Sequence, residues 1–443
     1  MSQLSLKPLR LAKTLRSSPL RNSSLVNANA RPIATRMCSC AFGLVDTTSP
    51  CGGERPLAER LAEHVRQVCG SVCEVDLFGD ARANVVMTAP GDAPTGLACY
   101  AHLDTSLTGE PDRDGAITGD SSSYPPIRFD GSTVTGLGLA VAKASAALAV
   151  VAFDAASEAL APLGAAHGLS VLLTSGGTHR WPVGEPGAAT ARFGSGARRA
   201  LARGFHPAGV VNVKAGAPAP LHEEPGAAYL TVRIRGPWEP ALFRGDHPGT
   251  LAALPVLLTA VEAWRSDVVA RPLPVGSVIG REVALGALRA GSLDKPDLLP
   301  GAIDARVFAV LAEGDSAEEL AAELEERLSD ACRTAGLADI RARVSADVAD
   351  PAGRTAADDP LVVAACAAWE RHIGVVPEVR GWRGSTDSCT FRAAGIPTVR
   401  MGPPVRRDPD DPRLDQVDID VLLAHASATA ETLVRATTAR RTP

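Results

Sequence analysis

The stretch GSTDSCTFRAAGIPTVRMGPP, residues 384–404, is the segment that decides the fold of this chain. It opens with the small polar run Gly384–Ser388, which is typical of a loop. The turn Ala394-Gly395-Ile396-Pro397 then leads into Thr398–Met401, a short run that predicts a buried strand. The strand ends at Gly402-Pro403, a second turn signal. The pattern therefore predicts a polar loop followed by a core strand.

Upstream of this stretch, the chain alternates between helices and strands. Arg55–Val68 has apolar residues at helical spacing and follows a Ser-Pro-Cys-Gly-Gly turn. Ala140–Ala156 is a buried helix by its length and its small residues. Strand, helix and strand in this order predict an α/β domain with a mostly parallel sheet covered on both faces. The other elements predicted for this domain are the strands Asn84–Met87, Gly96–Tyr100, Leu169–Leu173 and Gly209–Val213, and the helices Gly194–Arg203, Asp359–Ile373 and Ile419–Ala436.

The pattern changes near residue 225, where a strand with alternating apolar and polar residues begins. The segment that follows mixes antiparallel-looking strands with two helices. These elements are the strands Ala228–Arg235, Ile303–Leu311 and Ile340–Val344, and the helices Leu254–Arg265 and Ser316–Ala331. We therefore expect an α+β lid domain at residues 225–348, inserted into an α/β domain formed by residues 38–224 and 349–443.

Composition sets limits on the class of protein. A chain of 443 residues is too long for one ordinary core, so two domains are expected. A net charge of −5 argues against nucleic acid or an anionic membrane as the main partner. The longest apolar stretch, Gly138–Ala156, is interrupted by Lys143 and Asp154, which argues against a membrane span. The nine cysteines include no CxxC pair, so we expect reduced thiols and a cytoplasmic protein.

Residues 1–37 form a basic N-terminal extension that is expected to be disordered. Residues 1–36 are rich in Ser and Arg and contain no acidic residue. This composition is typical of an organellar transit peptide. The alternative is an over-extended start, with Met37 as the true first residue.

Several motifs in the body occur together in a fixed order. They are Ser49-Pro50-Cys51-Gly52-Gly53-Glu54, Tyr100-Ala101-His102-Leu103-Asp104-Thr105, the segment Ser292–Arg306 and the C-terminal stretch quoted above. Over residues 42–436, this ordered set resembles the acetylornithine deacetylase, succinyl-diaminopimelate desuccinylase and carboxypeptidase G family. The resemblance implies a dizinc aminoacylase-peptidase fold in which a lid is inserted into a catalytic α/β domain.

The resemblance also implies two zinc ions, held by a His, a bridging Asp, further carboxylates and a late His. His102 matches the first His, and Asp104 matches the carboxylate that orients it. The remaining ligand positions hold other residues. Val141 replaces the bridging Asp, Gly176-Gly177 replace a Glu pair, and Lys214 replaces a further carboxylate. No His follows the Gly-Pro turn where the late ligand belongs.

A catalytic zinc normally has three protein ligands, and a bridged pair needs more. We therefore expect no zinc and no other cofactor, especially since Lys214 places a cation where a cation should bind. The alternative is a local misalignment, in which a nearby side chain restores metal binding. The candidates for that role are His179, His222, Glu223 and Glu224.

Without a metal, His102 and Asp104 form the base-and-orienter half of a nucleophilic triad. Lysines would supply positive charge for a substrate carboxylate or a developing oxyanion. Arginines are candidate carboxylate clamps, because a guanidinium binds a carboxylate through two parallel hydrogen bonds. The candidate substrate-binding residues are Lys143, Lys214, Arg380, Arg383, Ser385, Thr386, Asp387 and Arg400.

Two hypotheses for function follow. The first is a metal-independent enzyme that acts on an amide or acyl-amino-acid type small molecule by transfer, condensation or hydrolysis, with His102 as general base. The second is a catalytically inactive pseudoenzyme that binds a ligand or partner. The resemblance also implies a homodimer through the lid, although the segment Gly236–Pro240 lacks the His that the family lends to its neighbour.

Overall fold

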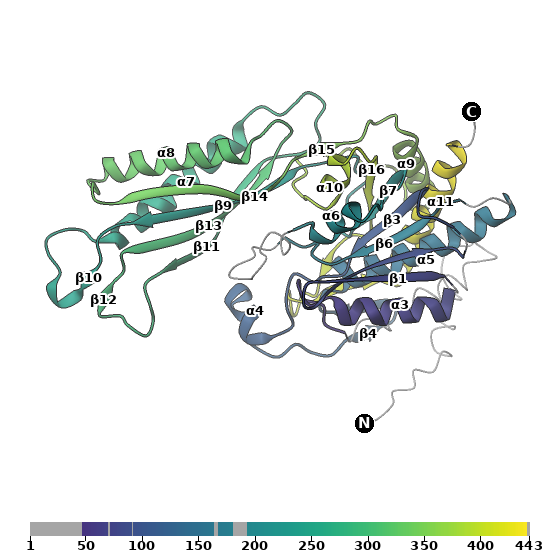
Figure 1. The fold of residues 1–443 in the computed structure, drawn as a ribbon, viewed down its shortest axis with the longest axis horizontal. Helices are drawn as coiled ribbons and strands as arrows, with labels where there is room; N and C mark the ends of the chain where they lie inside the picture. The colour runs from purple at the N-terminus through teal and green to yellow at the C-terminus, as the bar shows by residue number, and fades with distance from the viewer. Residues whose placement is uncertain (1–46, 70, 91, 164–166, 180–192, 441–443) are drawn as a thin grey trace. The chain divides into compact units, whose positions relative to one another are not determined.

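The computed structural model describes residues 47–440 except 70, 91, 164–166 and 180–192. The predicted extension at residues 1–37 lies outside the described residues. The chain divides into two compact units (Figure 1). The first comprises residues 1–222, 355–377 and 395–443, and the second comprises residues 223–354 and 378–394.

A six-stranded sheet forms the centre of the first unit (Figure 1). Its strands in spatial order are β1 (Val72–Phe78), β2 (Arg82–Thr88), β6 (Ser170–Thr174), β3 (Leu97–His102), β7 (Gly209–Val213) and β16 (Thr398–Met401). The four strands from β6 to β16 pair in parallel, whereas β1 and β2 are antiparallel. The predicted α/β class with a mostly parallel sheet is confirmed. The carboxyl ends of β6, β3 and β7 therefore meet at one edge, where a site is expected.

Helices cover this sheet and supply most of the apolar core. They are α3 (Arg55–Cys69), α5 (Ala144–Leu160), α6 (Ser195–Ala202), α9 (Pro360–His372) and α11 (Ile419–Ala439). α11 packs against both α5 and α9, and α5 packs against β3. The stretch Leu139–Leu163 is long and apolar enough to span a membrane by composition, but 83% of its most apolar window is buried inside this unit. Its packing as a core helix accounts for its composition.

A smaller antiparallel sheet in the first unit has no counterpart among the predicted elements. Its strands are β17 (Arg406–Arg407), β18 (Asp415–Asp418), β5 (Thr133–Gly136) and β4 (Arg128–Asp130). The short helix α4 (Pro111–Thr118) precedes it in the chain. The predicted helix at Ala140–Ala156 is also modified, because a π-helical turn at Leu139–Lys143 comes before α5. The strands are only two to four residues long, too short to show a clear hydrophobic alternation.

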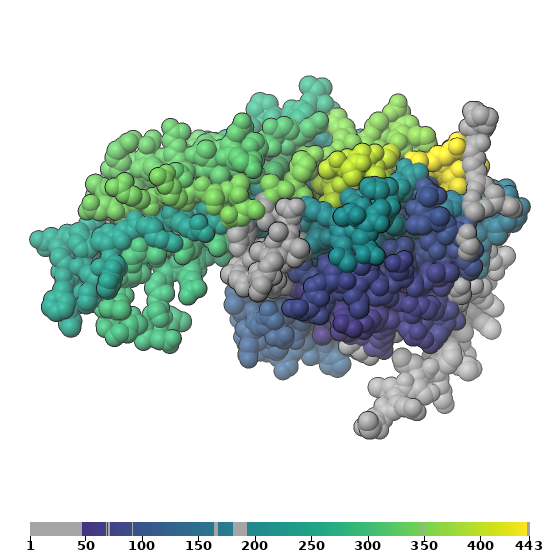
Figure 2. All heavy atoms as spheres, viewed as in Figure 1, coloured from purple at the N-terminus to yellow at the C-terminus, as the bar shows by residue number. Residues whose placement is uncertain are grey.

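The second unit is an α+β body built on one antiparallel sheet. Its strands in order are β11 (Glu282–Ala290), β13 (Ala302–Leu311), β9 (Gly226–Arg235) and β14 (Arg341–Asp350). The helices α7 (Ala253–Ala270) and α8 (Ala317–Thr334) pack on this sheet and on each other. In Figure 2, α8 forms part of the outer surface in green, consistent with a helix that buries Leu320, Leu324 and Leu328 and exposes its acidic side. Short pairs β10 (Glu239–Pro240) with β12 (Leu298–Leu299) and β8 (Glu223–Glu224) with β15 (Gly353–Arg354) complete it.

The segment Glu378–Ala394 groups with the second unit, whereas the sequence places it in the α/β domain. A buried ion pair accounts for the difference. Arg392 at the end of helix α10 (Ser388–Ala393) lies 3.1 Å from a carboxylate oxygen of Glu224, and both side chains are buried. Thr386 donates a hydrogen bond of 2.8 Å to the same carboxylate. These contacts attach the polar GSTDS loop to the base of the lid.

A substitution at Gly402 tests how closely the backbone after β16 approaches the backbone after β7. A Cβ atom at this position would lie 2.4 Å from the carbonyl oxygen of Lys214 and 2.6 Å from its carbonyl carbon. We expect Gly402→Ala to lower the free energy of unfolding by about 1–3 kcal/mol, because backbone must move to make room. Gly286→Ala is the control, since a Cβ at Gly286 would meet no atom within 4 Å. Urea denaturation of both variants checks this, and equal midpoints would contradict the close approach.

Candidate functional site

The carboxylate of Asp104 is the centre of a buried polar cluster at the end of β3. Its Oδ1 accepts hydrogen bonds from His102 Nδ1 at 3.2 Å and from the backbone N–H of Gly177 at 2.7 Å. Its Oδ2 accepts from the backbone N–H of Thr178 at 2.7 Å and from the Thr178 hydroxyl. Burial opposes ionisation, but His102 and these donors hold the pKa of Asp104 well below its ordinary value. Asp104 is therefore a stable buried anion.

His102 connects Asp104 to Lys214. The His102 side chain is 1% exposed, and its Nε2 lies 2.6 Å from the Lys214 ammonium nitrogen. Burial lowers the pKa of His102, and the Lys214 charge lowers it further, although Asp104 acts in the opposite direction. We therefore assign a neutral imidazole whose Nδ1–H donates to Asp104 and whose Nε2 accepts from Lys214.

Lys214 comes directly after β7, which lies beside β3 in the sheet. Its backbone N–H donates to the carbonyl of Met401 on β16 at 3.0 Å. Arg400, which is 4% exposed, donates from Nη2 to the carbonyl of Ala215 at 3.0 Å. Arg400 therefore supports the backbone next to Lys214, and its buried guanidinium is not presented as an open carboxylate clamp. Lys214 itself is partly exposed.

Glu54 is a second buried acid in the cluster, and the sequence reasoning gave it no role in the site. Its Oε1 accepts from the backbone N–H groups of Gly52 at 2.9 Å and Gly176 at 3.0 Å. Its Oε2 has no hydrogen-bond partner among the described residues. Burial and the nearby charge of Asp104 raise the pKa of Glu54 to about 7. The Ser-Pro-x-Gly-Gly-Glu motif was a signal for this residue, but only the fold shows that it approaches Asp104.

The two glycines that replace the expected Glu pair have a structural consequence. Gly176 adopts the left-handed region with φ of 72°, which favours glycine. Its N–H and that of Gly177 point at Glu54 and Asp104, respectively. The loop after β6 thus contributes donors to existing acids and adds no carboxylate of its own.

The other predicted site residues belong to other elements, and several of them make contacts of their own. Lys143, which is 3% exposed, ends the π-helical turn Leu139–Lys143. Arg383, Ser385, Thr386 and Asp387 lie in the second unit. There Arg383 pairs with Glu282 at 2.9 Å, and Asp387 begins α10. Ser385 and Thr386 are buried in the same loop, and the exposed Arg380 pairs with Glu378.

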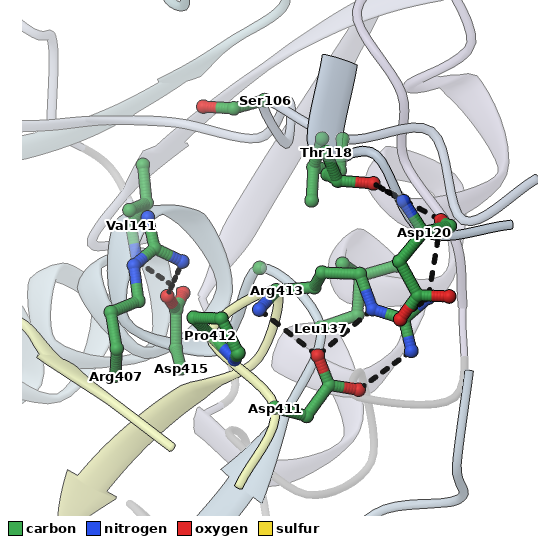
Figure 3. Close-up of a pocket in the computed structure, with 12 residues that line it drawn as sticks. Ser106, Thr118, Asp120, Leu137, Val141, Arg407, Asp411, Pro412, Arg413 and Asp415 are labelled. Atoms are coloured by element: carbon green, nitrogen blue, oxygen red, sulfur yellow. Dashed lines mark hydrogen bonds and ion pairs between the residues drawn. The ribbon is translucent and has the colours of Figure 1, made fainter. Parts of the chain in front are cut away.

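A cavity of about 400 Å³ lies in the first unit, next to the loop that follows Asp104. Ser106 from this loop lines one side, and Val141 lines another (Figure 3). Leu107, the next residue of the loop, also lines the cavity. Arg407 and Asp415 from the small antiparallel sheet complete the wall near Val141 (Figure 3). The sequence reasoning missed Arg407 and Asp415, because the sheet that carries them was not predicted.

Comparison with solved structures identifies the fold. No protein-family model and no curated protein matches the sequence. The chain is similar to aminopeptidase PepT from Bacillus cereus, with a TM-score of 0.60 and 16% identity over 91% of this chain and 99% of that chain. It is also similar to human carnosine dipeptidase 1, with a TM-score of 0.60 and 14% identity over 97% of this chain and 99% of that one. The M20 family metallo-carboxypeptidase Sso-CP2 from Sulfolobus solfataricus gives a TM-score of 0.61 and 13% identity, with 93% and 99% coverage. The fold is that of the M20 metallopeptidases.

An M20 fold implies a metal centre, so the residues present must be tested against one. Among the described residues, Cys51, Glu54 and Asp104 form a group whose ligand atoms lie within 4.8 Å of one another. Asp104 already accepts four hydrogen bonds, which uses the lone pairs of its two oxygens. Burial and Asp104 raise the pKa of Glu54 to about 7, so this carboxyl is a weaker anion at neutral pH than an ordinary glutamate. This group does not fit a metal ion.

The four residues that the sequence offered as replacement ligands are engaged elsewhere. The ring of His179 stacks on Phe193 with centroids 4.2 Å apart. His222 donates from Nδ1 to the carbonyl of Thr355 at 2.9 Å. Within the second unit, Glu223 pairs with Arg354 at 3.0 Å, and Glu224 pairs with Arg392. None of these four residues belongs to the group of Cys51, Glu54 and Asp104, whose ligand atoms lie close enough together for a metal ion.

The raised pKa of Glu54 predicts a pH-dependent stability. The folded state keeps a proton on Glu54 up to about pH 7, whereas the unfolded chain loses it near 4.5. Stability should therefore fall as pH rises from about 4.5 to 7, by about 3 kcal/mol for this group. Glu54→Gln keeps an Oε1 acceptor for Gly52 and Gly176 and removes the ionisation. The difference in unfolding free energy between wild type and Glu54→Gln should change across this window and be constant above it. Parallel pH curves for the two proteins would contradict a raised pKa.

Proposed function

We propose that this chain is a metal-independent enzyme that acts on a small amide or acyl-amino-acid type molecule. The observation that carries the proposal is the contact of 2.6 Å between the Lys214 ammonium and His102 Nε2. In a metal site, a histidine binds the ion through one ring nitrogen while the other donates to a carboxylate. His102 keeps this arrangement toward Asp104, but Lys214 lies at the other nitrogen. A side-chain cation therefore replaces the metal ion as the positive charge beside His102.

Lys214 is suited to stabilise negative charge that develops on a substrate carbonyl oxygen. An ammonium carries a full positive charge and three N–H donors, one of which faces His102. Asp104 is an anion whose two oxygens accept hydrogen bonds from His102, Gly177 and Thr178, so contacts other than Lys214 stabilise its negative charge. A fixed donor in a partly enclosed site stabilises an oxyanion more strongly than water does.

His102 acts through Lys214 in this proposal. When a nucleophile attacks the acyl carbon, the Lys214 ammonium gives the proton that faces His102 to Nε2 and in the same step takes the proton of the nucleophile, so that Lys214 stays a cation beside the oxyanion. Asp104 stabilises the imidazolium that forms, and the proton then returns by the same path to the leaving group. His102 is therefore the base in the relay, while Lys214 is the group that contacts substrate.

Ligand binding without turnover is the second candidate, and one observation favours it. Both ring nitrogens of His102 are engaged, and the side chains of His102 and Asp104 are 1% and 0% exposed. A base in this state acts on substrate only through Lys214. In a pseudoenzyme, the same cluster would have a structural role only, with the charges of Asp104 and Lys214 balancing each other through His102.

Several further properties stay proposals alongside these functions. We propose a cytoplasmic protein whose partner is an amide-like or amino-acid-like small molecule, with neither nucleic acid nor membrane as a partner. A homodimer through the second unit is also proposed. The assignment to the acetylornithine deacetylase, succinyl-diaminopimelate desuccinylase and carboxypeptidase G branch of the M20 fold rests on the motifs alone.

The proposal predicts turnover that does not need metal. The purified protein should contain substoichiometric zinc, and a panel of N-acyl amino acids and dipeptides should show activity that chelator leaves unchanged. Lys214→Met should reduce kcat by about 100-fold or more, because it removes the charge that stabilises the oxyanion. Lys295→Met is the control, since Lys295 is exposed and pairs with Asp297.

Nitrogen NMR of the His102 ring separates loss of the relay from loss of the fold. In Lys214→Met the pKa of His102 should rise relative to wild type, because a neighbouring cation is removed. Stoichiometric zinc with chelator-sensitive turnover would overturn the proposal. Binding of panel compounds without turnover would leave the second candidate in its place.

A further inference from the structure

We propose that the cavity beside Val141 binds the carboxylate end of the ligand through Arg407, and that its apolar wall receives the aliphatic part. The proposal rests on the proposed function, because it names the ligand class for the same face of the first unit. The cavity lies next to the loop that carries Asp104, through Ser106 and Leu107. Its volume of about 400 Å³ is within the range of small-molecule sites.

An ion pair with Asp415 fixes the position of the Arg407 side chain. Its Nη1 donates to Asp415 Oδ1, and Asp415 is completely buried. The other oxygen of Asp415 accepts from the backbone N–H groups of Ala140 at 2.9 Å and Val141 at 3.4 Å. This anchoring fixes the guanidinium near Val141 without enclosing it, because the Arg407 side chain remains 49% exposed. A guanidinium has five N–H donors, and the contact with Asp415 uses one of them.

Arg413, the other arginine that lines the cavity, is committed to structural contacts. Its side chain is 6% exposed, and two of its nitrogens bond to the carboxylate of Asp411 at 2.8 Å. Its remaining terminal nitrogen donates to the carbonyl of Ser122 at 2.9 Å. Figure 3 shows the Arg413 guanidinium paired with the Asp411 carboxylate, on the side of the cavity away from Arg407. Arg413 therefore shapes the wall, and Arg407 is the arginine that can meet a ligand.

The acids that line the cavity are also engaged. Asp411 is paired with Arg413, and Asp120 lies 3.3 Å from the same guanidinium. Asp415 is paired with Arg407 and with the first N–H groups of the π-helical turn. Two guanidinium groups and the backbone donors of the π-helical turn thus offset most of the negative charge of the three carboxylates, and Arg413 is shared by two of them. A ligand carboxylate therefore meets an exposed guanidinium without an unpaired acid beside it.

The rest of the wall is mostly apolar. Leu107, Leu137, Val141 and Pro412 supply hydrocarbon surface around the cavity. Val141 occupies the position that holds a bridging carboxylate according to the motif resemblance. A carboxylate there would repel a ligand carboxylate at Arg407, whereas an isopropyl group packs against an aliphatic chain. The cavity is thus suited to a small acyl-amino acid with an aliphatic side chain.

Calorimetric titration with N-acetyl-L-valine and its neutral analogue N-acetyl-L-valinamide tests this assignment. Wild type should bind the acid at least about tenfold more tightly than the amide, because the charge-assisted contact is lost in the amide. Arg407→Gln should abolish this preference. Arg406→Gln is the matched control, since Arg406 is the other exposed residue of the same two-residue strand. Unequal binding that persists in Arg407→Gln would overturn the assignment to Arg407.

Val141→Phe keeps the inference testable if Arg407→Gln fails to fold with Asp415 left unpaired. The larger ring should fill the cavity and weaken binding of N-acetyl-L-valine by about tenfold or more, while thermal unfolding reports an intact fold. Equal affinity for acid and amide in wild type, or no binding of either in the millimolar range, would overturn the inference. Lys214→Met should still bind the acid. Retained binding with turnover lost in this variant agrees with both proposals. Wild type that binds the acid with the expected preference but turns over no compound of the panel counts against the proposed function and leaves the cavity assignment standing.

Discussion

The buried negative charge of Asp104 is the constraint on which the site depends. A carboxylate removed from water is costly unless donors surround it, and here four donors converge on its two oxygens. They come from the end of β3 and from the loop after β6, so the requirement to satisfy one acid ties two neighbouring strand ends together. His102 extends the network to Lys214 after β7. Three parallel strands are thereby joined at their carboxyl ends by a single polar cluster.

The two glycines after β6 place backbone donors beside the buried acids of the cluster. Backbone N–H groups at Gly176 and Gly177 approach Glu54 and Asp104 closely, which a metal site with carboxylates in the loop would not need. The retained acids become internal acceptors, and one of them is kept protonated by burial. Groups of the chain itself thus stabilise the buried acids Glu54 and Asp104.

The sequence predicted the elements with strong local signals. The strands Gly209–Val213 and Thr398–Met401 appear with the predicted bounds, because each is a short apolar run between turn residues. The edge strands Val72–Phe78 and Glu282–Ala290 were missed, since half-exposed strands lack a continuous apolar signal. The small sheet of β17, β18, β5 and β4 was missed for the same reason.

Some residues of the candidate site were predictable from the sequence, and others were not. His102, Asp104 and Lys214 were recognisable because they occupy motif positions at strand ends, and the structure brings all three into contact. Glu54 and Arg407 were not, because their environment is made by segments far away in the sequence. The raised pKa of Glu54 depends on Asp104, which is 50 residues further along the chain. Burial and long-range pairing are set by the fold, and no local pattern encodes them.

The contact between Lys214 and His102 has a consequence for how the protein matures. A metal centre is filled after or during folding, from a pool in which several ions compete for the same ligands. An ammonium group is part of the chain and reaches His102 when β7 pairs with β3. Under the metal-independent function proposed above, the cluster is complete as soon as the sheet forms and needs no loading with an ion.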